Sequence, residues 1–398
     1  MPRYGIIDGL RGFFLVFMLI NHLVFEGGYW MLRVNHNQLA FVEDAQGFVF
    51  LSGLMIGLVY GRKMLRQGYA AGSRMIRARA FELYRYAIGI VLAVLVARLV
   101  LPYAGQLWFN WLGDTSLTGD PLRLAAIATF LFQPTIMDIL PQYVIYMLVA
   151  PPIVWLCLNG HVAKVAAGSA LLWFVGQLGL HHLVTDPLSA WITSSDGQGI
   201  RTGFNLLGWQ IVFFSGAAIG ALMASERIDW QGLLRPDRTL LPWICLVTCL
   251  MLLPLRVTTA HGLLPPDVAA KVATLEIRAD FSLIYLVNFS AAALGLAWLL
   301  IAGAEHRRPA VRRLATGLRA FFSLGPLRLL GRHSLHVYVW HVAIVYAVYY
   351  LDQASPPLSQ GAKTLIALVG LALLPLPALW RERARPATSA RAPVPLSS

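Results

Sequence analysis

The chain has 398 residues, of which 58% are hydrophobic and only 13% are charged, with a mean hydropathy of +0.63. Soluble domains carry about 25% charged residues, so this composition excludes a soluble enzyme, a coiled coil and a disordered protein. In a soluble chain, the net charge of +13 would favour a nucleic-acid partner. Here the basic residues stand in short gaps between long apolar runs, which predicts an integral membrane protein with no nucleic-acid partner.

Ten apolar runs are long enough to cross a bilayer, so the sequence predicts an all-α polytopic membrane protein of about ten transmembrane helices. In chain order the runs cover residues 9–25, 45–61, 86–101, 140–158, 162–180, 205–224, 239–255, 281–303, 335–351 and 362–380. The first run has the length of a signal peptide, but Arg11 and His22 interrupt it and no A-x-A-like cleavage site follows. We therefore expect it to be a retained helix.

A further run, residues 122–137, ends in Gln133 and Pro134, with Asp138 next to it. It is too short to cross a bilayer comfortably at a rise of about 1.5 Å per residue. We therefore expect one short re-entrant or interfacial helix there.

The charges of the gaps predict the orientation of the chain. The 62–85 gap holds six arginines and a lysine against one acid, and the 305–332 gap holds seven arginines. By contrast, residues 102–121 and 352–361 include no basic residue. The positive-inside rule places both basic gaps and both termini in the cytoplasm, with membrane lipid headgroups as partners of the arginines.

The sequence predicts a single membrane-embedded domain over residues 1–380. Residues 381–398 are rich in Pro, Ala, Ser and Arg, a composition that favours a disordered, basic cytoplasmic tail. The cysteines Cys157, Cys245 and Cys249 lie inside apolar runs without metal-ligand spacing. They are expected to be small core residues, and no metal site is predicted.

The first run concentrates polar residues: Asp8, Arg11, Asn21 and His22. Ionisable groups in a spanning helix are costly, so they usually mark function or a specific partner. Arg11 and His22 share one helix face about 16 Å apart, and Asp8 can pair with Arg11 on that face. Two interpretations remain open: a deep catalytic histidine with an ion pair below it, or a histidine bonded to a neighbouring carbonyl and a snorkelling arginine.

The second run has two acids at its outer edge, Glu43 and Asp44, which either orient His22 or a substrate hydroxyl, or are ordinary interface acids. Its S-G-x-x-x-G pattern, Ser52 to Gly57, predicts close helix packing.

Further polar residues in later runs are candidates for lining a substrate cavity or for interhelical hydrogen bonds. They are Gln142, Trp209, Gln210 and His341. The outer-loop tryptophans fit either an interfacial belt or sugar stacking. They are Trp30, Trp108, Trp111 and Trp191.

Several stretches resemble the OpgC family, which succinylates osmoregulated periplasmic glucans, within the acyltransferase-three superfamily. The opening D-G-L-R-G-(x)9-N-H, Asp8 to His22, contains the R-x10-H arrangement of that superfamily. The similarity to OpgC extends to FVFLSG at 48–53, LPQYVIYMLVAPP at 140–152, NLLGWQIVFFSGAAIG at 205–220 and LLGRHSLHVYVWH at 329–341. The chain differs where acids are usual in the pattern, with Asn21 before the histidine and Gln46 before FVFLSG.

The resemblance implies a transferase in the bacterial inner membrane, which moves a succinyl group from cytoplasmic succinyl-CoA, a co-substrate, to periplasmic glucan hydroxyls without a tightly bound cofactor. His22 matches the family's catalytic histidine, and Asp8 and Arg11 match its charged pair. We expect His22 to act as general base, with Asn21 and Gln142 as oxyanion donors. No serine or cysteine stands out as a nucleophile, so direct transfer is favoured. Two alternatives remain, an acetyl-type acyltransferase acting on another envelope polysaccharide or lipid, and a transporter or flippase.

Two cation sites complete the expectations. Arg77, Arg79 and Arg85 are candidates for holding the coenzyme A phosphates, against a role in topology and lipid contact. A succinyl donor also brings a carboxylate that needs a cation in a low-dielectric cavity. Arg11, Arg98 and a protonated His341 qualify by depth, and Arg98 is the preferred candidate for this carboxylate clamp, against snorkelling to the outer interface. The sequence leaves the oligomeric state open.

Overall fold

The computed structural model describes residues 5–113 and 120–384, and these ranges form helices joined by turns and loops. Within these two ranges, nine helical segments are long and apolar enough to cross a membrane. A tenth span results if α9 (Val162–Gln177) and α10 (His182–Ile192), which meet at an angle of 58°, are counted together. The expected all-α polytopic membrane fold is therefore confirmed.

The spanning helices follow the predicted runs with shifted ends. They are α1 (Gly5–His22), α2 with its continuation (Asp44–Gln67), α4 (Tyr69–Val100), α8 (Ile139–Leu158), α11 (Leu206–Ala224), α13 (Leu240–Ala260), α15 (Leu283–Ile301), α18 (Ser334–Ala354) and the segment Gln360–Arg383. The last of these divides into α19 (Gln360–Leu373) and α20 (Leu376–Arg383). Helix α20 thus includes the first residues of the expected tail, and residues 385–398 lie outside the described part.

The gaps between predicted runs are more helical than the sequence suggested. Helix α4 begins at Tyr69 and includes much of the arginine-rich 62–85 gap, because arginine and alanine are good helix formers. The break before it is at Gly68, whose φ of +82° suits glycine. The 305–332 gap forms α16 (Pro309–Phe322) and α17 (Gly325–Arg332).

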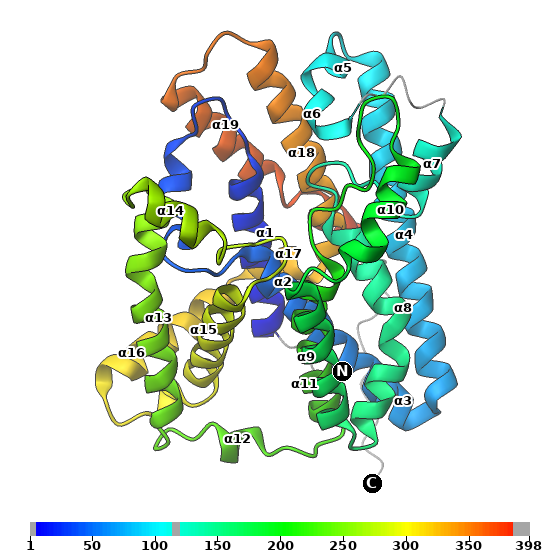
Figure 1. Cartoon of the computed structure of the whole chain (residues 1–398). Coiled ribbons are helices and arrows are strands. Elements are labelled where there is room, and N and C mark those ends of the chain that lie inside the picture. Colours follow the sequence, from blue (N-terminus) through cyan, green and yellow to red (C-terminus); the bar gives the residue numbers. More distant parts are fainter. Residues whose placement is uncertain (1–4, 114–119, 385–398) are drawn as a thin grey trace.

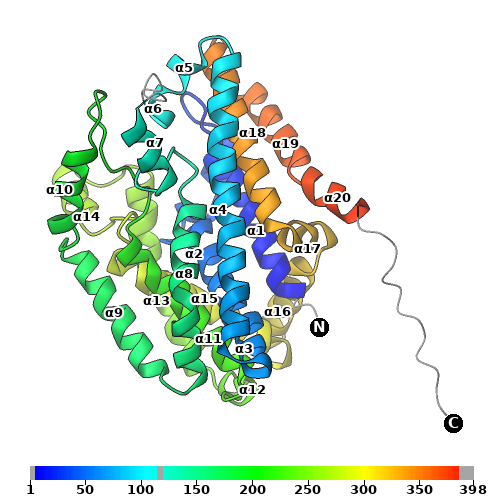
Figure 2. The same cartoon turned by 90° about the vertical axis from the view of Figure 1, so that its right-hand side faces the viewer.

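The short helix expected within 122–137 is α7 (Pro121–Ala128), which begins with Pro121 after the capping residue Asp120. The chain then runs irregularly to α8. Short helices also lie at one end of the bundle, where α5 (Ala104–Leu107) and α6 (Phe109–Leu112) follow α4 and lie beside its end (Figures 1 and 2). The arginine-rich α3 (Gly61–Gln67) lies at the opposite end. The charge asymmetry of the sequence therefore corresponds to two opposite ends of the molecule.

Helices α1, α2, α8, α11 and α18 form the packed centre, and α4 packs on α8 and α18 at its edge, while α13 is mostly exposed and packs on α15 (Figure 1). The predicted S-G-x-x-x-G packing has α11 as its partner. A Cβ at Gly53 would lie 2.0 Å from the Phe213 carbonyl oxygen, and one at Gly220 would lie 2.1 Å from that of Leu54. Only glycine allows so close a backbone approach.

Candidate functional site

The carboxyl end of α1 places His22 against a second histidine. Nδ1 of His22 lies 3.0 Å from Nε2 of His341 in α18, and Nδ1 of His341 lies 2.6 Å from the carbonyl oxygen of Tyr338. His341 is fully buried, whereas His22 is half-buried. The sequence singled out both histidines and left two roles open for His341, lining a substrate cavity or forming an interhelical hydrogen bond. The structure shows an interhelical hydrogen bond, with His22 as the partner.

The neighbouring residue, Asn21, organises a separate polar cluster. Its amide nitrogen donates to the Asp44 carboxylate, and its amide oxygen accepts from the side chains of Asn35 and Asn37. Asp44 was expected to orient His22, to bind a substrate hydroxyl, or to be an ordinary interface acid. In the structure its carboxylate is hydrogen-bonded to Asn21, so these contacts give His22 and Asn21 different partners.

The same cluster includes His36, which the sequence analysis did not single out. Its Nε2 lies 3.4 Å from the Asp44 carboxylate, and its ring packs edge-on against Phe17. Burial lowers the pKa of His36 to about 4, because a charged imidazole loses hydration there. The short polar run N-H-N-Q at 35–38, between two apolar runs, is the sequence signal that could have found it.

Glu43 is the capping residue that precedes α2, and it forms an ion pair. It forms a capping box with Gln46, and its carboxylate lies 2.9 Å from Nε of Arg278. Burial raises the pKa of Glu43, and the guanidinium groups of Arg278 and Arg256 oppose that shift. Gln46, which stands where the family pattern has an acid, therefore stabilises the first turn of α2.

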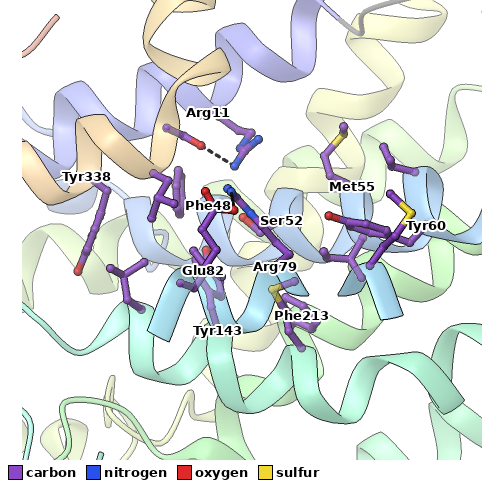
Figure 3. A pocket seen from close by; sticks show the side chains of 18 of the residues that line it. Arg11, Phe48, Ser52, Met55, Tyr60, Arg79, Glu82, Tyr143, Phe213 and Tyr338 are labelled. Atoms are coloured by element: carbon purple, nitrogen blue, oxygen red, sulfur yellow. Dashed lines mark hydrogen bonds and ion pairs between the residues drawn. The ribbon is translucent and has the colours of Figure 1, made fainter. Parts of the chain in front are cut away.

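The amino-terminal half of α1, which includes Arg11, faces a cavity of about 560 Å³ (Figure 3). Arg11 lines it and donates a 2.7 Å hydrogen bond to the Ser334 hydroxyl. Across the cavity, Arg79 and Glu82 of α4 form an ion pair of 2.6 Å. The wall is otherwise mostly apolar. It includes Phe48, Met55, Ile56, Val59, Met75, Leu83, Leu140, Met147, Phe213 and Leu335.

Close backbone contacts position Arg11. A Cβ at Gly9 would lie 1.7 Å from the Phe322 carbonyl oxygen, and one at Gly12 would lie 1.9 Å from that of Leu327. Reciprocally, a Cβ at Gly331 would lie 1.8 Å from the carbonyl oxygen of Asp8. The glycines of D-G-L-R-G thus let α1 pack directly on α16 and α17.

A π-helical turn forms another part of the wall. Residues Ile56–Tyr60 follow α2 as a π-helix, a rare conformation that occurs frequently at functional sites. The side chains of Ile56, Val59 and Tyr60 line the cavity, and Tyr60 is visible at its edge in Figure 3. The sequence carried no signal for this turn.

Hydroxyl groups also line the cavity. Ser52 and Tyr143 point toward Arg11 and Arg79 in Figure 3. Tyr338 lines the cavity on one side and contacts the ring of His341 on the other, with a ring-centroid distance of 4.8 Å. Tyr338 therefore links the cavity wall to the histidine pair.

Of the remaining cationic candidates, one lies at the cavity and the others lie elsewhere. Of the three proposed coenzyme A arginines, Arg79 lines the cavity, while Arg77 and Arg85 are exposed on α4. Arg98 borders a separate open depression with Tyr103, Gln106, Phe109 and Asn110.

Three residues expected either at a substrate cavity or in interhelical hydrogen bonds make internal contacts. Gln142 is buried and donates to the Tyr146 hydroxyl, and its amide oxygen has no hydrogen-bond partner within the described part of the chain. Trp209 donates to the carbonyl oxygens of Arg278 and Ala279. Gln210 is hydrogen-bonded to Ser169 of α9.

The outer tryptophans divide into two groups. Trp108 and Trp111 are 2% and 8% exposed and pack on Tyr346, so sugar stacking does not fit them. Trp30 and Trp191 are 55% and 70% exposed, which leaves both original interpretations open for them. Among the described residues, no group of three or more His, Cys, Asp or Glu side chains is placed to hold a metal ion.

Comparison with known proteins gives one finding. The family model described as OpgC protein matches residues 3–386, nearly the whole chain. No curated protein and no solved structure matches the chain.

Proposed function

This chain belongs to the OpgC protein family, and we propose that it moves a succinyl group from cytoplasmic succinyl-CoA to hydroxyls of a periplasmic glucan. The family supports a glucan-modifying membrane acyltransferase, and donor, acceptor and an inner-membrane location with cytoplasmic termini are our proposal. One observation carries it. Helix α1 joins a cavity-lining Arg11 to His22 eleven positions later, about 16 Å away along the helix.

The cavity has the chemistry that a thioester donor needs. Its apolar wall suits an acyl chain, and a few hydroxyls and cations provide orientation. Arg77 and Arg85 are exposed on other faces of α4, and Arg79 is the arginine of the three that lines the cavity. Arginine forks bind phosphates well, so we expect the nucleotide part of succinyl-CoA to bind there.

The acceptor approaches from the opposite end of α1. His22 is half-buried and thus accessible in part. The Glu43–Arg278 pair and the Asn21–Asp44 cluster provide donors and acceptors for hydroxyl groups near it. A glucan presents many hydroxyls, which matches this polar end better than the largely apolar cavity.

His22 acts as general base in the transfer. It takes the proton of the acceptor hydroxyl while the hydroxyl oxygen bonds to the thioester carbon. The carbon–sulfur bond then breaks, and the thiolate takes up that proton. A positioned histidine contributes about 10²–10⁴-fold to such a step.

The test uses purified full-length protein in lipid nanodiscs with succinyl-CoA, with and without periplasmic glucan. We expect release of free thiol that depends on glucan, and slower release from acetyl-CoA. His22→Ala should lower turnover at least a hundredfold. His182→Ala is the matched control, because that exposed histidine pairs with Asp186 in α10.

Glucan-independent activity, or full activity of His22→Ala, would contradict the proposal. An equal rate with acetyl-CoA would leave an acyltransferase but refute the succinyl assignment. Movement of glucan across the bilayer without thiol release would favour the transporter alternative.

A further inference from the structure

We infer that His341 is a positioning residue for His22. It holds the His22 imidazole in the tautomer protonated on Nδ1, so that Nε2 is the atom that accepts the hydroxyl proton. This inference rests on the proposed function, in which His22 is the base. It adds the atom of His22 that takes up the proton, and it adds His341, which is more than three hundred positions from His22 in the sequence.

Donor and acceptor can be assigned in both hydrogen bonds of the His22–His341–Tyr338 chain. The Tyr338 carbonyl oxygen accepts hydrogen bonds and cannot donate one, so Nδ1 of His341 carries the proton of the 2.6 Å bond. A neutral imidazole has a single N–H, and Nε2 of His341 is therefore an acceptor. The 3.0 Å contact then requires Nδ1 of His22 to donate. The lone pair of His22 is left on Nε2.

Burial supports a neutral ring at His341. His341 has no exposed surface, and an unpaired imidazolium in such a place would be costly. Asp44, the acid expected near His22, accepts its hydrogen bond from Asn21. The ring of His22 is thus oriented through a neutral histidine whose own bond ends at a backbone carbonyl. This arrangement fixes a tautomer without a permanent charge.

The turn of α18 that holds His341 is itself well fixed. The Tyr338 hydroxyl donates to the carbonyl oxygen of Ile136, and its ring packs on His341. Because Tyr338 also lines the Arg11 cavity, the acceptor carbonyl belongs to the same wall that would hold the donor. His341 does not line that cavity, so it acts through His22.

Loss of the His341 acceptor has a defined chemical consequence. Without it, the His22 proton is free to sit on Nε2, and a protonated Nε2 cannot accept the hydroxyl proton. The ring also loses the contact that fixes its rotation. We therefore expect turnover to fall while binding of the donor is unaffected.

The experiment uses full-length protein in nanodiscs with ¹⁵N-labelled histidine rings, and the His22 signals are identified by their loss in His22→Ala. In the wild type we expect a protonated Nδ1 and an unprotonated Nε2. His341→Phe should move the proton to Nε2 and lower kcat about tenfold or more, with the donor KM changed less than about twofold. His341→Gln, whose amide oxygen can accept the bond, should keep the tautomer and recover most of kcat.

The control is His336→Phe on the same helix, where the ring contacts Tyr86 and Arg381 instead. It should change neither the His22 tautomer nor kcat. A His22 protonated on Nε2 in the wild type would overturn the inference without any variant. So would a His341→Phe variant that keeps the tautomer, or one that changes it at full kcat. Failure of the proposed function is separate, because it shows as an active His22→Ala, whereas the tautomer is read independently of catalysis.

Discussion

The contact between α2 and α11 predicts a large effect from a single methyl group. In Gly53→Ala the new Cβ would lie 2.0 Å from the Phe213 carbonyl oxygen, and a Cβ closer than 3.0 Å to another atom is essentially never found. Both partners are backbone in packed helices, so no side chain can rotate away. The two helices must therefore part by about 1 Å or more at this point.

The expected magnitude follows from that displacement. Overpacking of a tight contact costs about 1–3 kcal/mol of stability. The helices also form the cavity wall, with Phe48 and Ser52 from α2 and Phe213 from α11. A shift of about 1 Å in a positioning element can lower turnover about a hundredfold. We therefore expect turnover to fall by more than the loss of folded protein accounts for.

The assay compares thermal unfolding in detergent and glucan-dependent thiol release for Gly53→Ala and Gly89→Ala. Gly89 is the matched control, because it lies in the spanning helix α4 and a Cβ there would meet no atom within 4 Å. Alanine should leave stability unchanged or raise it by about 0.5–1 kcal/mol at that position. If both variants unfold at the same temperature and retain full activity, the reasoning from close packing is refuted.

Three further predictions concern charged groups. The acyl carboxylate of succinyl-CoA lies only roughly 5 Å from the thioester carbon. Arg278 pairs with Glu43, which precedes the Asp44 that Asn21 holds beside His22. We therefore expect Arg278 to be the clamp, and Arg278→Gln should lower the rate with succinyl-CoA more than with acetyl-CoA; selectivity lost in Arg98→Gln instead would return the clamp to the sequence-based candidate. Because His36 has a folded pKa of about 4 against 6.5 unfolded, the unfolded state binds more protons between these values, and the melting temperature should fall as pH drops from 6.5 to 4. His36→Gln should flatten that slope, and an unchanged slope would contradict the assignment. Asp196→Ala leaves the buried Arg123 without its 2.8 Å ion-pair partner and should cost about 3–5 kcal/mol in thermal unfolding, where a loss below about 1 kcal/mol would refute a stabilising pair.

The sequence by itself determined the features that depend on local composition and spacing. Apolar runs of spanning length predicted the membrane helices, and the arginines of the gaps predicted two differently charged ends. The spacing of Arg11 and His22 on one helix also follows from helical geometry alone. These properties need no partner helix, so no tertiary contact could change them.

The tertiary structure decided which polar residues meet. Asp44 was a reasonable candidate partner of His22, but its carboxylate is hydrogen-bonded to Asn21. The hydrogen-bond partner of His22 is His341. Spanning helices are apolar on almost every side, so their sequences carry little signal of which face meets which neighbour. The backbone contacts of Gly9 and Gly12 with residues more than three hundred positions away set that registry. Pairing across such a separation comes from packing, and the sequence of one helix cannot specify it.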